Sequence, residues 1–202
     1  MSKEDLRVVK TLESIEASLL TNLKKYPLTK ITVDTLCKEA RINRSTFYKY
    51  YSDKYDLLSN YLSKVLLEFK KKMDVSFINA SPSTINEDRY SHQFQDILTF
   101  LGNRKDIYII LWDAIMERDI YSEMIDIIQN NIFEQMEDNF SKDSESFMYI
   151  TLFSRLFPSN LMMSVRWWFE YQNDISPDDF TKLTDNTMRV GIFKTFKEYV
   201  RT

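Results

Sequence analysis

Residues 31–58 read ITVDTLCKEARINRSTFYKYYSDKYDLL, and the second part of this stretch, residues 43–58, has an unusual composition. These sixteen residues include four tyrosines and three basic residues but no glycine. A core helix rarely carries so many hydroxyls and charges, and a solvated helix rarely carries so many aromatic rings. The composition therefore favours contact with a partner surface that is both flat and anionic.

The spacing of apolar residues predicts that this stretch lies among four helices. The first helix, in residues 4–25, has apolar residues about one turn apart, at Val8, Leu12, Ile15, Leu19 and Leu23. Thr32 and Asn43 are suitable N-caps for two short helices. A fourth helix then follows Ser52 or Asp53. Two short helices joined by about three residues and packed against a longer helix are typical of a helix-turn-helix.

The predicted third helix, residues 44–51, has two different faces. Phe47 and Tyr51 are one turn apart and face the small core. Polar and basic side chains lie on the opposite side, at Ser45, Thr46, Tyr48 and Lys49. Arg44 stands at the N-terminal end, where a recognition helix meets base edges, and hydroxyls and cations suit phosphate oxygens. The sequence therefore predicts that this helix binds DNA.

Residues 31–58 resemble the DNA-binding domain of the TetR/AcrR family of bacterial transcription regulators. The shared pattern is Thr-Val, six residues, a tight turn, Thr-Phe-Tyr-x-Tyr followed by an aromatic residue, and a lysine where the next helix starts. The resemblance implies phosphate contacts by Thr32, Thr46, Tyr48 and Lys54. It also implies that four residues face the major groove, namely Arg44, Ser45, Lys49 and Tyr50.

Arg41 departs from the family pattern, which usually has glycine at the turn. A left-handed backbone costs a residue other than glycine about 1 kcal/mol. Two alternatives stay open, a strained left-handed turn and a slightly reshaped one, and in either case Arg41 is placed to add a phosphate contact.

The rest of the chain is predicted to be helical as well. Two glycines and four prolines are too few for the many turns of a strand-rich fold. Residues 74–91 are polar and aperiodic and are expected to form a linker, whereas helical patterns occupy 92–101, 107–116, 120–140, 145–172 and 177–199. We predict an all-α protein. A three-helix helix-turn-helix domain (residues 1–55) precedes a helical-bundle domain for ligand binding and dimerisation (residues 56–202).

The distribution of charge along the chain agrees with this division. Residues 1–55 contain eleven Lys and Arg against seven Asp and Glu, a net charge of +4, which leaves −7 for the remainder of a chain whose total is −3. A positive N-terminal module favours a polyanion as its partner.

The apolar run 147–169 contains Arg155 and Arg166, each costing about 2.5–3.5 kcal/mol near a bilayer centre. We therefore expect a buried helix there and no membrane span.

The resemblance also implies a homodimer, formed through the last two helices, that binds a near-palindromic DNA operator. A small, largely apolar or aromatic effector would release a dimeric repressor from this operator. Residues to search for a ligand pocket are aromatic or Met: Phe100, Trp112, Met116, Phe153, Phe157, Met163 and Trp167. Plain core packing is the simpler interpretation of any one of them. Control by a protein partner, or a role as an activator, stays open.

The sequence does not predict an enzyme. A helical di-iron site needs two histidines, and the chain has one. No zinc cluster, glycine-rich phosphate loop or Ser-x-x-Lys arrangement occurs, so no metal or other cofactor is expected. The single cysteine, Cys37, is expected to be buried. A cytoplasmic location is expected because no signal segment opens the chain and a single cysteine suits a reducing compartment.

Overall fold

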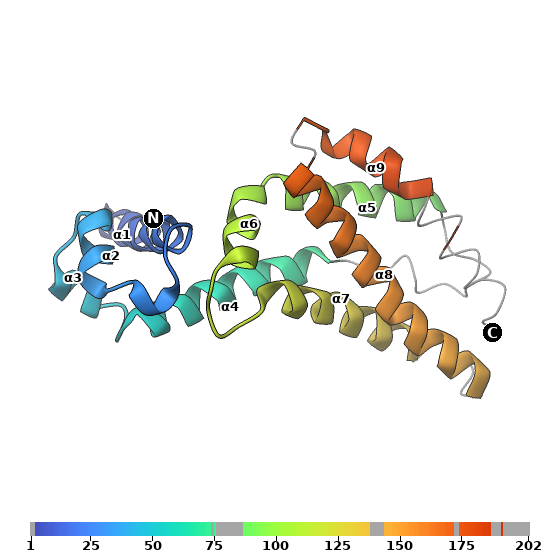
Figure 1. Ribbon diagram of the computed structural model, residues 1–202, viewed down its shortest axis with the longest axis horizontal. Helices are drawn as coiled ribbons and strands as arrows, with labels where there is room; N and C mark the ends of the chain where they lie inside the picture. Colours follow the sequence, from blue (N-terminus) through green and yellow to red (C-terminus); the bar gives the residue numbers. More distant parts are fainter. Residues whose placement is uncertain are drawn as a thin grey trace. The chain divides into compact units, whose positions relative to one another are not determined.

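The computed structural model describes residues 3–73, 75, 87–137, 144–171, 174–186 and 191, and in these residues every regular element is a helix (Figure 1). The all-α prediction is confirmed. The chain forms two compact units. The first unit comprises Met1–Leu67 and Asp106–Ile120, and the second comprises Glu68–Lys105 and Tyr121–Thr202.

Three helices and a single 3-10 turn precede the long helix α4 (Lys54–Lys72), and they are α1 (Lys3–Leu23), η1 (Leu28–Lys30), α2 (Val33–Ala40) and α3 (Arg44–Tyr48). The third helix is shorter than predicted. It ends at Tyr48 because the amide of Tyr50 donates to Phe47 O at 3.0 Å, which closes a tighter turn. Asp53 caps α4, since its carboxylate accepts hydrogen bonds from the amides of Tyr55 and Asp56 at 2.8 and 2.9 Å.

The apolar stripe of α1 and the inner face of α3 form the core of the first unit. Ile15 and Leu19 are fully buried, as are Leu36 of α2 and Phe47 of α3. Tyr51 is also buried, and its ring lies 5.8 Å from that of Phe47. The prediction that Phe47 and Tyr51 face the core is therefore confirmed.

Helix α6 (Lys105–Asp113) belongs mostly to the first unit. It begins two residues before the predicted start and ends three residues before the predicted end. The chain that follows α6 contacts η1, because the amide of Leu28 donates to Ile115 O at 3.2 Å. This hydrogen bond joins residues from distant parts of the sequence within the first unit.

The described residues of the second unit form four further helices, α5 (Glu87–Gly102), α7 (Ile120–Glu137), α8 (Ser144–Tyr171) and α9 (Pro177–Asn186). Helix α5 begins inside the segment expected to be a linker. Ser176 caps α9 through its hydroxyl, which accepts from the amide of Asp179 at 3.2 Å, and Pro177 is the first helical residue, as predicted. The end predicted for this helix, near residue 199, lies outside the described residues.

The indole of Trp168 connects α8 to its neighbours. Its ring stacks on Phe180 of α9 with 4.6 Å between centroids, and its N–H donates to Ile175 O at 2.8 Å. A Cβ atom at Gly102 would lie 2.9 Å from the same indole, so a residue without a side chain is needed at the end of α5.

The compact units do not coincide with the predicted domains. We expected a boundary after residue 55, whereas α4 belongs to the first unit up to Leu67 and to the second unit from Glu68. Residues 106–120 also join the first unit. A compact unit describes packing rather than function, so the functional division at residue 55 stays a prediction.

Candidate nucleic-acid interface

The turn between α2 and α3 has a left-handed residue at Arg41. Its φ and ψ angles are 54° and 45°, and Arg41 is the only residue other than glycine with a positive φ in the described chain. The amide of Ile42 donates to Cys37 O at 3.0 Å and thereby closes α2. Of the two alternatives for this turn, the structure therefore has the strained one, in which Arg41 adopts the conformation that favours glycine.

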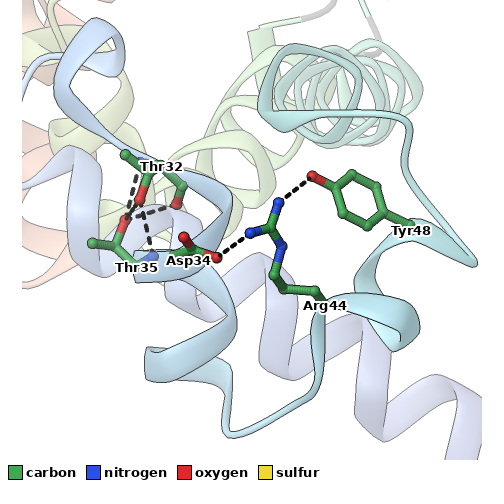
Figure 2. A network of polar contacts seen from close by, with 5 residues as sticks. All are labelled: Thr32, Asp34, Thr35, Arg44 and Tyr48. Carbon is green, nitrogen blue, oxygen red and sulfur yellow. Dashed lines mark hydrogen bonds and ion pairs between the residues drawn. The ribbon is translucent and has the colours of Figure 1, made fainter.

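The N-terminus of α2 is held by a reciprocal pair of threonines (Figure 2). The amide of Thr35 donates to the hydroxyl of Thr32 at 3.1 Å, and the amide of Thr32 donates to the hydroxyl of Thr35 at 3.0 Å. This capping box confirms Thr32 as the N-cap. Thr32 is exposed. It lies at a helix N-terminus, where the helix dipole and free amides favour a phosphate.

Arg44, the first residue of α3, links α2 and α3 through a polar network (Figure 2). Its guanidinium donates to the hydroxyl of Tyr48 at 3.3 Å and forms an ion pair with Asp34 at 3.1 Å. The hydrogen bond to Tyr48, followed by the charge of Asp34, raises the pKa of Arg44. Both Arg44 and Asp34 are more than half exposed, so water screens their attraction and a DNA partner can replace it.

The other predicted contact residues follow the helical geometry of α3 and the turn after it. Ser45 and Lys49 point away from the core and are exposed. Thr46 and Tyr50 are half-buried on one side of α3, and Tyr48 is exposed on the other. Since the buried face is occupied by Phe47, the exposed surface of α3 consists of hydroxyl and basic groups. The structure thus brings six predicted contact residues together on α3 and the turn after it, namely Arg44, Ser45, Thr46, Tyr48, Lys49 and Tyr50.

Lys54 has an additional role that sequence reasoning missed. Its ammonium group donates to the backbone oxygens of Leu28, Thr29 and Ile31, at 2.9, 3.1 and 2.7 Å. These three bonds use all the hydrogens that an ammonium group has. Lys54 therefore fastens the start of α4 to the turn before α2, and its predicted phosphate contact stays a prediction.

Asp34 was also missed as part of the site. Its signal in the sequence was weak, because an acidic residue in the first turn of a helix is already explained by the helix dipole. The structure shows that the same carboxylate reaches Arg44 of the next helix. Cys37 is buried, as expected, and burial raises the pKa of its thiol.

The residues considered for a ligand pocket divide between the two units. Trp112 and Met116 lie in the first unit, and the other five lie in the second. Phe153 and Phe157 are buried and their rings stack 6.0 Å apart. Phe100 is half-buried under the guanidinium of Arg104, which lies 4.6 Å from its ring.

Met163 and Trp167 are exposed by 61% and 40%, and together they line a hollow of about 380 Å³ between α8 and α9. The seven residues stay predicted ligand contacts. In the described part of the chain, no group of three or more His, Cys, Asp or Glu side chains is placed to hold a metal ion. No described helix is long and apolar enough to cross a membrane.

Helix α8 has a second apolar face in addition to its buried one. Its inner face includes Phe153, Phe157 and Val165. Apolar side chains about one or two turns apart are exposed on α8, at Met148, Leu152, Leu156, Met163, Trp167 and Tyr171. This α8 stripe is about 35 Å long at 1.5 Å per residue. A row of exposed apolar side chains along a helix is typical of a protein interface.

Solved structures of other proteins share this fold, and two of them serve as examples. The fatty acid degradation regulator FadR from Bacillus halodurans has a TM-score of 0.60 at 13% identity, over 90% of this chain and 96% of that one. A protein from Pseudomonas aeruginosa PAO1 assigned as a transcriptional regulator has a TM-score of 0.58 at 14% identity, over 96% of each chain. No family model and no curated protein matches the sequence. At these identities, the likeness shows the fold that the chain shares with these proteins.

Proposed function

We propose that the protein is a sequence-specific DNA-binding transcriptional regulator that uses α2 and α3 as a helix-turn-helix. The observation that carries the proposal is α3 itself. Its inner side is fixed by Phe47, and Arg44, Ser45 and the following Lys49 are exposed to solvent. Two solved structures of similar fold are described as regulators, which supports the proposal. The resemblance of residues 31–58 to the TetR/AcrR family supports it independently.

Contacts to DNA are divided between positioning and reading. Thr32, Thr46 and Tyr48 would donate hydrogen bonds from their hydroxyls to phosphate oxygens. Arg44, Ser45, Lys49 and Tyr50 would face the major groove, and a guanidinium can bind guanine through both O6 and N7. The ion pair with Asp34 would then be exchanged for a base contact. Such a regulator acts where bacterial DNA is, in the cytoplasm.

The proposed regulator is a homodimer because α3 alone reads too few base pairs to define a site. The α8 stripe is the proposed dimer interface, and α9 adds the exposed Leu183 beside it. An isologous pair of α8 helices would relate the two recognition helices by a twofold axis. They would then lie about 34–36 Å apart on DNA and bind a near-palindromic operator.

Regulation by a small, largely apolar or aromatic effector is the mechanism we propose for releasing a repressor from its operator. Helix α4 begins at Lys54, whose ammonium group is hydrogen-bonded to the turn before α2, and the helix continues into the second unit. The chain after α6 contacts the same turn through Ile115 O. An effector shifts the equilibrium only by its different affinities for the two forms, and a coupling of about 3 kcal/mol weakens DNA binding roughly 150-fold.

Control by a protein partner, in a repressor or an activator, is the second candidate. The exposure of Met163 and Trp167 favours it, because a side chain that binds a ligand in an enclosed pocket is usually covered. A thermal-shift screen of small apolar compounds separates the two candidates. Compounds that stabilise the protein and weaken its DNA binding support the effector, provided that DNA weakens the binding of the compound by the same factor.

Selection from a random duplex library tests the proposed function. The wild-type protein should enrich a near-palindromic sequence with half-sites one helical turn apart, bound as two copies per duplex. Arg44→Ala should lose this enrichment, whereas Lys70→Ala, which changes an exposed residue near the other end of α4, should keep it. A wild-type protein that enriches no sequence would refute the proposal.

A further inference from the structure

A basic hollow borders the helix-turn-helix on the side of α3 that faces α1. It has a volume of about 660 Å³. Four cationic residues line it, and they are Arg7 from α1, Lys38 from α2, Arg41 from the turn and Lys49 after α3. None of the described lining residues carries a carboxylate. We call this the α1–α3 hollow, and it combines positive charge with hydroxyl groups from Thr11, Thr46 and Tyr50.

The position of the hollow on α3 follows from helical geometry. Successive residues are about 100° apart around a helix. With Phe47 pointing inward, Ser45 and Lys49 point outward, Arg44 and Tyr48 lie on one flank, and Thr46 and Tyr50 lie on the other. The Arg44 flank is the one beside Asp34 at the start of α2 (Figure 2). The Thr46 flank borders the α1–α3 hollow.

A helix in the major groove has phosphates along both flanks. The groove is about 12 Å wide, and a helix with its side chains is about 10–12 Å across. The phosphates of one strand therefore pass the Arg44 flank, where Thr32 and Tyr48 lie, and those of the other strand pass the Thr46 flank. The charge of the hollow suits the second strand.

We propose that the α1–α3 hollow binds the sugar-phosphate backbone of the second DNA strand, with Arg7 and Lys38 as phosphate contacts that act together with Arg41. The proposal rests on the proposed DNA-binding function and adds α1 to the interface. Helix α1 then contacts the DNA backbone through Arg7, in addition to supporting the core through Ile15 and Leu19. Arg41 gains a role at a turn position where its backbone is strained.

The test is the salt dependence of DNA binding by the double variant Arg7→Gln/Lys38→Gln. Arg41 is left unchanged because its left-handed backbone would confuse the result. The probe is a random-sequence duplex of about 20–25 base pairs, since phosphate contacts do not depend on sequence. Lys70→Gln/Lys72→Gln is the matched control, because it removes the same charge from exposed residues of α4.

Each lost phosphate contact lowers the slope of log K against log salt by about 0.9. A dimer of the double variant loses two contacts in each subunit, so its slope should be smaller by about 3.6. The ratio of wild-type affinity to variant affinity should therefore fall about 150-fold between about 50 and 200 mM salt. The control should keep the wild-type slope. Thermal unfolding of both variants should match wild type, because all four changed side chains are exposed.

A double variant with the same slope as the control overturns the inference while leaving the proposed function intact. Absence of any wild-type binding at low salt overturns both. A small anion is the other conceivable occupant. If inorganic phosphate at constant ionic strength raises the unfolding temperature of wild type but not of the double variant, and the slopes agree, the hollow binds free anions and the proposal is wrong.

Discussion

Replacing Lys54 by methionine separates a structural role from a phosphate contact. The ammonium group makes three hydrogen bonds of 2.7–3.1 Å to the turn before α2. Methionine has a similar length and a similar helix propensity, so the helix itself is little affected. The variant loses the three bonds and leaves the oxygens of Leu28, Thr29 and Ile31 without their shared cation.

The expected cost is about 2 kcal/mol. A hydrogen bond to a charged group contributes about 1.5–3 kcal/mol when it is well shielded, and water can replace part of the loss at this half-buried turn. For a chain of this size, the unfolding temperature should fall by about 4–8 °C. Urea denaturation provides the free energy of unfolding, and Lys70→Met, on the exposed side of the same helix, is the control.

Salt dependence completes the test. If the ammonium group stays on the turn when DNA is bound, Lys54→Met keeps the slope of log K against log salt, whereas the predicted phosphate contact would make the variant lose part of this slope. A variant of unchanged stability whose slope falls by about one per half-site would refute our reasoning. In that case Lys54 leaves the turn and contacts phosphate, as the family resemblance implies.

Four other predictions follow from the same structure. Arg41→Gly should raise the free energy of unfolding by about 1 kcal/mol in urea denaturation, because glycine relieves the left-handed strain, whereas a loss of stability would show that the arginine side chain supports the turn. Arg44→Ala should weaken binding to the selected operator by about 1–3 kcal/mol per half-site and relax base discrimination, whereas Tyr48→Phe should weaken binding to all duplexes; equal losses on all sequences for Arg44→Ala would contradict its assignment to base edges. Leu152→Glu/Leu156→Glu should give a monomer in sedimentation velocity, whereas Leu67→Glu, which changes a similarly exposed leucine of α4, should not; a dimeric double variant would place the interface elsewhere. Cys37 should react slowly with a thiol reagent at pH 8 until the protein is unfolded, because burial raises its thiol pKa and keeps the thiolate scarce; rapid labelling of the native protein would argue against this burial.

The sequence predicted the elements whose signals are local. Periodic apolar residues identify α1 and α4, and N-cap residues such as Thr32 and Ser176 mark where helices begin. The burial of Phe47 and Tyr51 also follows from their spacing. Glycine scarcity excluded a strand-rich fold before any contact was known. These inferences hold because they depend on a few neighbouring residues.

Contacts between residues far apart in the chain could not be predicted from the sequence. The bond from Leu28 to Ile115 joins positions far apart in the chain, and no local pattern indicates it. From the sequence, Lys54 is expected to be a surface cation, because its hydrogen bonds form only when the turn before α2 packs against it. The α1–α3 hollow likewise exists only once Arg7 and Lys38 are brought beside α3. Helix ends were imprecise for a related reason, since α3 closes through a tighter turn that periodicity does not reveal.

Directed cleavage of DNA from α3 tests the central claim most directly. The chain has a single cysteine, so Cys37→Ala provides a background in which Ser45→Cys, on the exposed side of α3, carries an iron chelate. We expect the selected operator to be cut at two symmetric positions about one helical turn apart. The same chelate on Ser59→Cys, an exposed position of α4, should leave these positions uncut. Absence of cleavage from residue 45 on a duplex that the protein still binds would contradict the placement of α3 in the major groove.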